Sequence, residues 1–228
     1  DYRQLNNITR KDAYPLPNIE DALSLLAGAQ YFCTLDLASG YWQVELNEEA
    51  KAKSALCTRN GLYQFRVMPF GLSNAPATFE RLMELCLKGL NWRECVVYID
   101  DIIVFGRTFH DCHARLEHVF SRLRKTNLKL KPKKCHLFQP STLYLGYKVS
   151  GDGIQPDPAK IEAVKTWSPP CSLKGVRAFL GVVGYHRKFI PNLAEIAEPL
   201  TMLSRKKQPF IWGTAQQSAY DVLIQADK

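Results

Sequence analysis

The sequence predicts an α+β domain followed by a helical domain, and three features of the chain support this fold class. Short apolar or aromatic runs bounded by turn residues, which are typical of strands, fall between residues 31 and 149. Apolar residues at helical spacing lie between those runs and prevail after residue 151. The sequence Gly-Asp-Gly at 151–153 marks the change of pattern. A chain of 228 residues is long enough for one large domain or two small ones.

Local signals predict each element in turn. Asn18 is a suitable cap for the first helix. Arg59-Asn60-Gly61 predicts a hairpin, because Asn-Gly between β-like runs is a strong turn signal. The expected elements of the first part are helix 19–27, strands 31–37, 53–58 and 62–67, a loop over 68–76 that opens a helix, strand–turn–strand over 94–105, helix 109–126 and strand 142–149. After residue 151, helices are expected over 157–167, 172–189, 192–203 and 214–225.

Positive charge is concentrated in the second half of the chain. Residues 1–117 hold 12 Lys or Arg and 15 Asp or Glu, whereas residues 118–228 hold 18 and 7. Between His118 and Gly151 there are eight basic residues and no acidic one. A one-sided positive charge indicates an anionic polymer such as nucleic acid as partner, and a solvated helix face is an equally good interpretation of the charge alone.

Composition excludes several classes of protein. With 46% hydrophobic and 23% charged residues, the chain is neither disordered nor collagen-like. No run approaches the roughly 18–20 apolar residues of a membrane span. Seven scattered cysteines without a CxxC pair argue against a disulfide framework and favour a reducing, intracellular setting. Cys112 lies among three histidines, but the spacing fits no zinc pattern, so an amphipathic helix is the preferred interpretation.

Three aspartates carry the main functional signal. Asp100 and Asp101 interrupt an apolar stretch, and Asp36 lies near the end of an apolar strand. Adjacent acids suit the expected two-residue hairpin turn poorly, because such turns need positive φ and favour Asn-Gly. If the strand ends converge, the three carboxylates would form a two-metal site for phosphoryl transfer, and Mg²⁺ suits such oxygen ligands. Turn acids or salt-bridge acids are the alternative.

These carboxylates stand in motifs that resemble those of reverse transcriptases. Tyr98-Ile99-Asp100-Asp101 resembles the YxDD signature of that family. The other similar segments are the first carboxylate motif at 35–41, the loop and helix at 68–79, the primer-gripping hairpin at 143–147, and the thumb of Ty3/gypsy-type retrotransposon polymerases at 180–190 and 197–200. The order and spacing of the motifs agree, and the similarity covers essentially the whole chain.

The resemblance implies both a fold and an activity. The fold would be a reverse-transcriptase palm, a ferredoxin-like split βαβ arrangement, with partial fingers and an α-helical thumb. Fingers and palm would occupy residues 1–150, the thumb residues 151–210, and the start of a connection to an RNase H domain residues 211–228. The implied activity is that of an RNA-directed DNA polymerase, which extends a primer from dNTPs with two Mg²⁺ ions or with Mn²⁺ in their place. The alternative is a non-catalytic, nucleic-acid-binding remnant of a decayed element.

The resemblance also implies roles for individual residues. Asp36, Asp100 and Asp101 would hold the metal ions, and Lys134, with Lys133 as the alternative, would be the general acid at the leaving pyrophosphate. The implied nucleotide-binding residues are Leu37, Ser39, Gly40, Tyr41 (the steric gate against a ribose 2′-OH), Phe70, Gly71 and Ile99. The residues implied in gripping the primer and the duplex are Tyr98, Leu145, Gly146, Lys174 and Arg177, together with the basic run Arg205-Lys206-Lys207.

The two ends of the chain depart from the family pattern. Residues 1–6 resemble a segment inside the fingers, and the triphosphate-clamping Lys and Arg that precede it in the family are missing. We therefore expect a fragment of a Pol polyprotein whose remainder includes RNase H and integrase, with truncated fingers and weak or no activity of its own. Its expected partners are RNA/DNA and DNA duplexes and dNTPs, with no membrane. Its expected location is cytoplasmic, in a retrotransposon particle.

Overall fold

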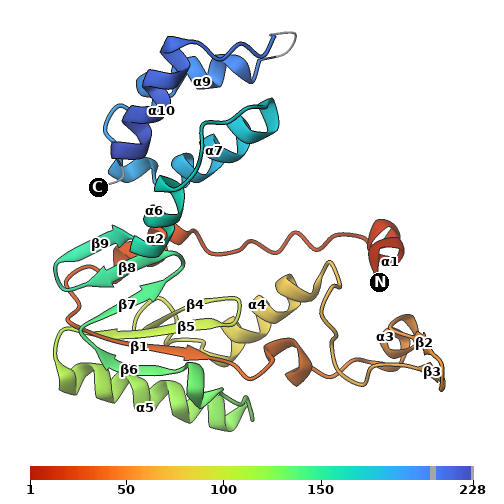
Figure 1. The fold of residues 1–228 in the computed structure, drawn as a ribbon. Coiled ribbons are helices and arrows are strands. Elements are labelled where there is room, and N and C mark those ends of the chain that lie inside the picture. The colour runs from red at the N-terminus through yellow and green to blue at the C-terminus, as the bar shows by residue number, and fades with distance from the viewer. Residues whose placement is uncertain (206–208, 227–228) are drawn as a thin grey trace. The chain divides into compact units, whose positions relative to one another are not determined.

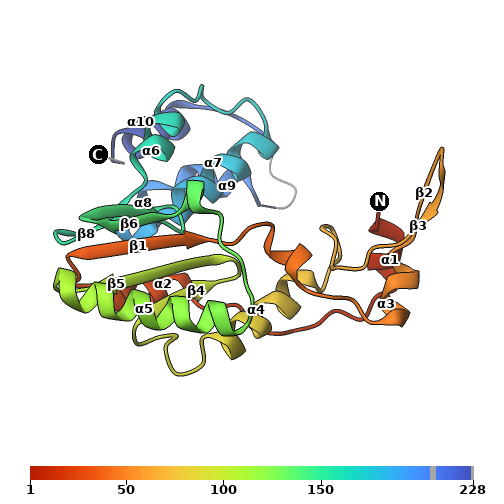
Figure 2. The same cartoon turned by 90° about the horizontal axis from the view of Figure 1, so that it is seen from below.

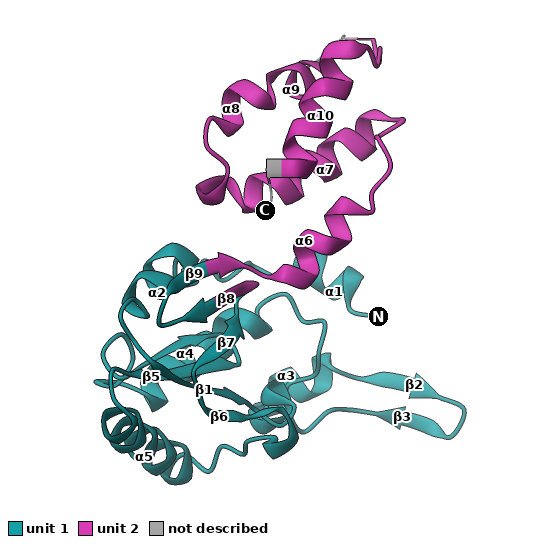
Figure 3. Cartoon of the chain, turned by 60° about the vertical axis from the view of Figure 1, so that its left-hand side comes forward, with its two compact units in different colours: residues 1–145, 149–154 teal, residues 146–148, 155–228 magenta. Residues whose placement is uncertain are grey.

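The computed structural model describes residues 1–205 and 209–226, and the chain forms two units (Figure 3). Unit 1 comprises residues 1–145 and 149–154, and unit 2 comprises residues 146–148 and 155–228. Unit 1 contains Asp36, Asp100 and Asp101 and the strands of the first half of the chain, whereas the helices after residue 157 belong to unit 2.

One four-stranded sheet with the order β4-β5-β1-β6 forms the centre of unit 1 (Figure 1). Its strands are β1 (Tyr31–Asp36), β4 (Cys95–Tyr98), β5 (Asp101–Gly106) and β6 (His136–Gln139). β1 runs antiparallel to β5 and β6, and β4 runs antiparallel to β5. The predicted strand at 31–37 and the predicted pair of strands within 94–105 are confirmed, whereas the sequence pattern did not indicate β6.

Two helices cover one face of this sheet, namely α4 (Ala75–Cys86) and α5 (Phe109–Lys125), and Figure 2 shows α5 lying along the strands. Alternate strand residues point to this face, as the period of two requires. The buried cluster between sheet and helices includes Cys33, Leu35, Val97, Ile102 and Val104 of the strands, Phe79 and Met83 of α4, and Leu116 and Val119 of α5. Each large side chain buried here contributes about 1.5–3 kcal/mol, so this cluster fixes the sheet against both helices.

Side-chain caps begin several of the helices where the sequence predicts them. Asn18 accepts the Glu20 N–H at the start of α2 (Ile19–Leu25). Thr108 accepts the Asp111 N–H at the start of α5, whose last turn carries three basic residues that favour the negative end of the helix dipole. The predicted helices at 19–27, after the loop 68–76, and at 109–126 are confirmed.

The hairpin between residues 53 and 67 is shorter than predicted. It consists of β2 (Leu56–Thr58) and β3 (Gly61–Tyr63), joined by Arg59-Asn60. Residues 48–53 instead form helix α3 (Glu48–Lys53), in which Asn47 caps the first turn by accepting the Ala50 N–H. The prediction that Lys53 begins a strand is therefore wrong, because this local cap and the Lys51–Glu48 ion pair stabilise a helical turn there.

The single strand predicted at 142–149 is two strands. β7 (Ser141–Tyr144) and β8 (Tyr147–Ser150) are joined by Leu145-Gly146, whose φ angles are +49° and +77°. With β9 (Gly153–Pro156) they form a second sheet of order β7-β8-β9. This turn matches the hairpin that the family resemblance implies here. Because it interrupts the strand, the prediction of one continuous strand is wrong.

Residues 6–14 make hydrogen bonds with the loop 71–74 and with helix α4. Within helix α1 (Arg3–Ile8), Asn6 donates to the Gly71 carbonyl (2.8 Å) and accepts the Ser73 N–H (2.8 Å). Arg81 of α4 pairs with Asp12 (2.9 Å) and stacks over a tyrosine ring, that of Tyr14. These contacts join the N-terminal segment to the loop that follows β3.

Unit 2 is helical, and its helices are α6 (Pro158–Lys165), α7 (Leu173–Tyr185), η3 (Arg187–Phe189), α8 (Leu193–Ile196), α9 (Glu198–Leu203) and α10 (Thr214–Ala226). The helix predicted over 192–203 is divided at Ala197, because Pro199 has no N–H to continue the hydrogen-bond ladder. Phe179, Leu200 and Leu223 are buried in the core, where the Phe179 and Tyr220 rings lie 4.9 Å apart. None of the helices in the described ranges is both long and apolar enough to cross a membrane.

Candidate functional site

The register of the central sheet brings two of the predicted acids together. Asp36, the last residue of β1, lies directly opposite Asp101, the first residue of β5. Asp100 immediately precedes Asp101. Partial desolvation, followed by the negative charges of Asp100 and Asp36, raises the pKa of Asp101, and the ammonium of Lys134 lowers it. The predicted convergence of the strand ends is confirmed for these residues.

The turn between β4 and β5 lies one residue earlier than predicted. Tyr98 pairs with Asp101, so the two turn residues are Ile99 and Asp100 rather than Asp100 and Asp101. Ile99 has a φ of +57°, a left-handed conformation that is unusual for a β-branched residue. The correction places Asp100 at the tip of the hairpin and Asp101 in the sheet beside Asp36.

A lysine contacts the acids from the loop before β6. Lys134, at the end of the short helix η2 (Pro132–Lys134), donates from Nζ to Oδ2 of Asp36 at 2.9 Å. This hydrogen bond and the Asp36 charge raise the pKa of Lys134, so its side chain is an ammonium. The Lys131 N–H also donates to the Asp36 carbonyl (2.8 Å), which joins the loop to β1.

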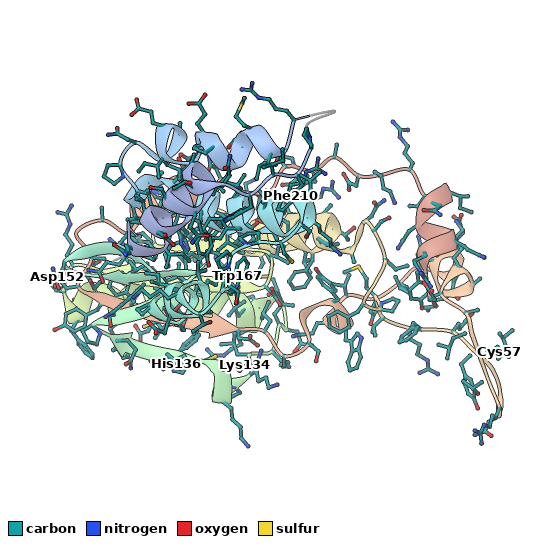
Figure 4. All side chains as sticks on the ribbon, turned by 45° about the horizontal axis from the view of Figure 1, so that its top comes forward. Cys57, Lys134, His136, Asp152, Trp167 and Phe210 are labelled. Atoms are coloured by element: carbon teal, nitrogen blue, oxygen red, sulfur yellow. The ribbon has the colours of Figure 1, made fainter. Side chains whose placement is uncertain are left out.

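The acids face a small polar cavity within unit 1. Its volume is about 190 Å³, and its lining includes Asp36, Asp101, Lys134, His136, Tyr144 and Leu145. Figure 4 shows Lys134 and His136 next to each other beside the sheet. Leu145, a predicted primer-grip residue, therefore lies at the same cavity as two of the predicted metal ligands.

The donor atoms at this end of the sheet suit a divalent cation. Carboxylate oxygens are the hard ligands that Mg²⁺ and Mn²⁺ prefer. Desolvation and then the charges of Asp100 and Asp36 raise the pKa of Asp101, and a cation would relieve the repulsion between these charges. Across residues 1–205 and 209–226, however, no group of three or more His, Cys, Asp or Glu side chains is arranged to hold a metal ion. The acids fit the metal chemically, and Asp36 is paired with the Lys134 ammonium.

The segment after β1 places aromatic rings beside the acids. Ser39 is left-handed (φ +52°), and a Cβ on Gly40 would come within 2.8 Å of Cζ of Phe79, so the chain needs glycine there. The Tyr41 ring lies 5.3 Å from Phe70 and 5.4 Å from Phe79. Burial, and after it the charge of Asp100, raise the pKa of Tyr41.

The remaining predicted residues occupy varied positions. Leu37 is buried and bridges to Leu130, Tyr98 ends β4, and Gly71 has a φ of +91°. Lys174 and Arg177 are exposed on α7 of unit 2, to which Gly146 also belongs. In the basic run at 205–207, Lys206 and Lys207 lie outside the described residues.

Two residues near the acids were not singled out from the sequence. Gln43, in η1 (Gly40–Gln43), donates to the carbonyls of Ala38 and Lys129 and accepts the Lys129 N–H, which fixes the loop beside Asp36. Glu80 is fully buried in α4, and its Oε2 accepts the Ile99 N–H at 2.5 Å. The available signal for Glu80 was its place in the sequence. It directly follows Phe79 and precedes Met83 by three residues, and both of these are core positions.

The histidines around Cys112 form no metal site in the described chain. Cys112 is buried with its Sγ 3.7 Å from Sγ of Cys33, and His118 pairs with Glu94 at 2.7 Å. Helix α5 is amphipathic and packs Cys112 against the sheet. The preferred interpretation of this segment as an amphipathic helix is therefore confirmed.

Comparison with known proteins agrees with this geometry. The family model described as "Reverse transcriptase (RNA-dependent DNA polymerase)" matches residues 1–149. The chain is 45% identical over 207 residues to the retrovirus-related Pol polyprotein from transposon 297 of Drosophila melanogaster, covering 91% of this chain and 20% of that protein. It is 36% identical over 234 residues to the corresponding polyprotein from transposon gypsy of the same organism, covering 98% and 23%. The chain thus spans about a fifth of the length of these relatives.

Solved structures show the same fold. A foamy viral protease-reverse transcriptase in complex with double-stranded DNA superposes with a TM-score of 0.89 at 24% identity, covering 100% of this chain and 48% of that chain. The foamy viral enzyme in complex with an RNA/DNA hybrid superposes with a TM-score of 0.85 at 24% identity, covering 100% and 31%. The predicted α+β fold of a reverse-transcriptase palm with a helical thumb is confirmed, and the chain belongs to the reverse transcriptase (RNA-dependent DNA polymerase) family.

Proposed function

We propose that this chain carries the RNA-directed DNA polymerase site of a transposon Pol polyprotein. The observation that supports it best is the register of β1 and β5, which sets Asp36 opposite Asp101 with Asp100 at the adjoining turn. In the proposed reaction the primer 3′-hydroxyl forms a bond to the α-phosphorus of a dNTP, and the bond to the leaving pyrophosphate breaks. The relatives are longer than this chain. We propose that the RNase H and integrase portions lie in the rest of the polyprotein.

The three aspartates are the proposed metal ligands. Asp36 and Asp100 would be shared by two Mg²⁺ ions, Asp101 would support the ion at the primer end, and the carbonyl of Leu37 would add an oxygen ligand. The ions would supply positive charge to the attacking and leaving oxygens of the transfer, and Mn²⁺ accepts the same ligands. After desolvation, the charges of Asp100 and Asp36 raise the pKa of Asp101, and this supports the role because a cation would offset those charges.

The segment after β1 is the proposed nucleotide pocket. The N–H groups near Ser39 and Gly40 would face the triphosphate, since consecutive backbone donors in a left-handed bend suit anions. Tyr41 would exclude a ribose 2′-hydroxyl, and its packing against Phe70 and Phe79 supports a fixed ring position. Phe70, Gly71 and Ile99 would complete the pocket.

Lys134 is the proposed general acid. Its ammonium already lies 2.9 Å from Asp36, so it is within reach of the acid cluster. In the proposed reaction Lys134 gives a proton to the leaving pyrophosphate. Its ammonium must then leave Asp36 and contact the substrate instead. Lys133 stays the alternative.

The proposed partners are RNA/DNA and DNA duplexes. Tyr98, Leu145 and Gly146 would hold the primer strand, and Lys174 and Arg177 would contact duplex phosphates. We propose fingers and palm at 1–150, a thumb at 151–210 and the start of a connection at 211–228. The cytoplasmic location also stays a prediction.

Primer extension tests the proposed function. Oligo(dT) on poly(rA) should be extended in Mg²⁺ or Mn²⁺ by this chain or by a longer version that includes the residues preceding Asp1. Asp100→Asn should abolish extension and leave metal-free duplex affinity within about twofold, because it removes a metal ligand and no phosphate contact. Asp152→Asn, in the exposed turn before β9, is the matched control and should extend normally. Failure of the longer protein, with duplex binding retained, would instead support a non-catalytic binding remnant.

A further inference from the structure

The turn that carries Asp100 is held in a conformation that its own sequence disfavours. Ile99 has a φ of +57°, and the left-handed region crowds a Cβ against the following carbonyl, most severely for branched side chains. Such a residue persists only where surrounding structure holds it. The question for this site is therefore which group holds Ile99.

The contact to Ile99 comes from a buried carboxyl in helix α4. Glu80 Oε2 accepts the Ile99 N–H at 2.5 Å, and the Glu80 residue is 0% exposed. Burial raises the pKa of Glu80, the hydrogen bond from Ile99 lowers it, and the charge of Glu84 raises it. A carboxyl in such a position costs stability, which makes a purely structural reason for it weak.

A second buried polar group, that of Tyr144, lines the cavity beside Asp36 and Asp101. Glu80 Oε1 and the Tyr144 hydroxyl are both buried, and neither has a hydrogen-bond partner among the described residues. Burial and then the charges of neighbouring groups, with Asp101 first and Glu80 among the others, raise the pKa of Tyr144 well above its ordinary value. The two groups thus belong to one polar region that adjoins the acids.

We propose that Glu80 is a positioning residue for the polymerase site: it holds Ile99 in its left-handed conformation and so directs the Asp100 carboxylate. Asp100 follows Ile99 directly, and a change of φ at Ile99 would swing Asp100 away from Asp36 and Asp101. Glu80 itself touches neither substrate nor metal. This inference rests on the proposed function, and it adds a residue to it.

Kinetics of variants at both positions test the coupling. Glu80→Leu removes the acceptor at similar volume and should lower kcat at least about tenfold, with metal-free duplex affinity unchanged. Glu80→Gln keeps an acceptor and should stay within about threefold of the wild type. In an Ile99→Gly background, where positive φ has no Cβ penalty, the loss from Glu80→Leu should shrink to less than about threefold. Glu117→Gln, at an exposed position of α5, is the matched control.

Hydrogen exchange supplies a measurement that does not need polymerase activity. The Ile99 amide should be protected in the wild type and in Glu117→Gln, and it should exchange at least about tenfold faster in Glu80→Leu. If Glu80→Leu does not fold, Glu80→Gln decides, since its neutral acceptor binds the amide more weakly and should speed exchange several-fold.

The outcomes separate the two proposals. Unchanged Ile99 exchange in the folded Glu80 variants, or an equal kcat loss in the wild-type and Ile99→Gly backgrounds, would overturn the role of Glu80. Loss of protection in a protein that never extends primers would leave the role of Glu80 in the turn standing and would instead contradict the polymerase proposal.

Discussion

Two hairpins of unit 1, β2–β3 and β4–β5, have turns of equal length that are held in different ways. In β2–β3 the positive φ falls on Gly61, which has no Cβ to clash. Thr58 Oγ1 accepts the Asn60 N–H and donates to the Gly61 carbonyl, so this turn supports itself. In β4–β5 the positive φ falls on Ile99, and its N–H donates to the Glu80 carboxyl of helix α4.

The difference shows where each turn is encoded. All residues of β2 and β3 are exposed, and the turn residues alone specify the hairpin. The β4–β5 turn contradicts its local preference, and it contacts α4 through the hydrogen bond from Ile99 to Glu80. Violations of local rules concentrate at functional sites, because there a side chain is selected for what it binds.

Exchanging the turn chemistry should have the largest effect. Replacing Ile99-Asp100 with Asn-Gly supplies the residues that a two-residue turn prefers and should leave the fold intact. Primer extension should fall by about 10³-fold or more, because the change removes a carboxylate that the proposed metal ions share and with it several kcal/mol of transition-state stabilisation. Steady-state extension on poly(rA)/oligo(dT) and thermal unfolding measure the two effects.

A substitution in the other turn gives the control for this experiment. Arg59→Asn alters the β2–β3 turn without touching the acids, and extension should stay within about twofold. A variant with Asn-Gly at 99–100 that still extends primers would show that the β4–β5 turn does not carry the activity.

Much of the fold followed from local patterns. Apolar runs identified β1, β4 and β5, and the caps Asn18 and Thr108 stand at the starts of α2 and α5. The predictions were wrong where tertiary contacts decide the secondary structure or where an element is short. Helix α3 replaced part of a predicted strand, and the strand β6, which was not predicted, consists of only four residues, most of them exposed. The division of the last strand at Leu145-Gly146 followed from the family motif and not from periodicity.

The site was predictable to a different extent. Asp36, Asp100 and Asp101 stood out because acids interrupt apolar strands. The pairing of Asp36 with Asp101 depends on sheet register, which two segments 65 residues apart cannot specify alone. Glu80 was missed because its partner is a backbone N–H, which the sequence does not identify, although its place between the core residues Phe79 and Met83 marked it as an unusual acid.

A branched residue at Gly61 should strain the hairpin that supports itself. Gly61→Val forces a Cβ into a φ of +137°, and the cost is about 1–3 kcal/mol, confined to the hairpin. Hydrogen exchange over residues 56–63 should quicken while the unfolding temperature of the chain stays within about 2 °C, because no core residue contributes to this hairpin. A fall in the unfolding temperature comparable to that of a core substitution would show that the hairpin is coupled to the sheet.

The smallest effect we expect is on the pH dependence of stability. Burial raises the pKa of Glu80 above its ordinary value of 4.5, so the folded chain binds its proton more tightly than the unfolded chain. The stability that this group contributes is therefore full below pH 4.5 and is lost as the pH rises through the folded-state pKa. Glu80→Gln stays neutral and should be more stable than the wild type at pH 7, with the difference vanishing at pH 4 in urea unfolding.

Asn60→Asp, which adds a carboxylate to the exposed turn, should show no such difference between the two pH values. Equal stability of Glu80→Gln and wild type at pH 7 would mean that the hydrogen bond from Ile99 fully offsets the cost of burying the charge.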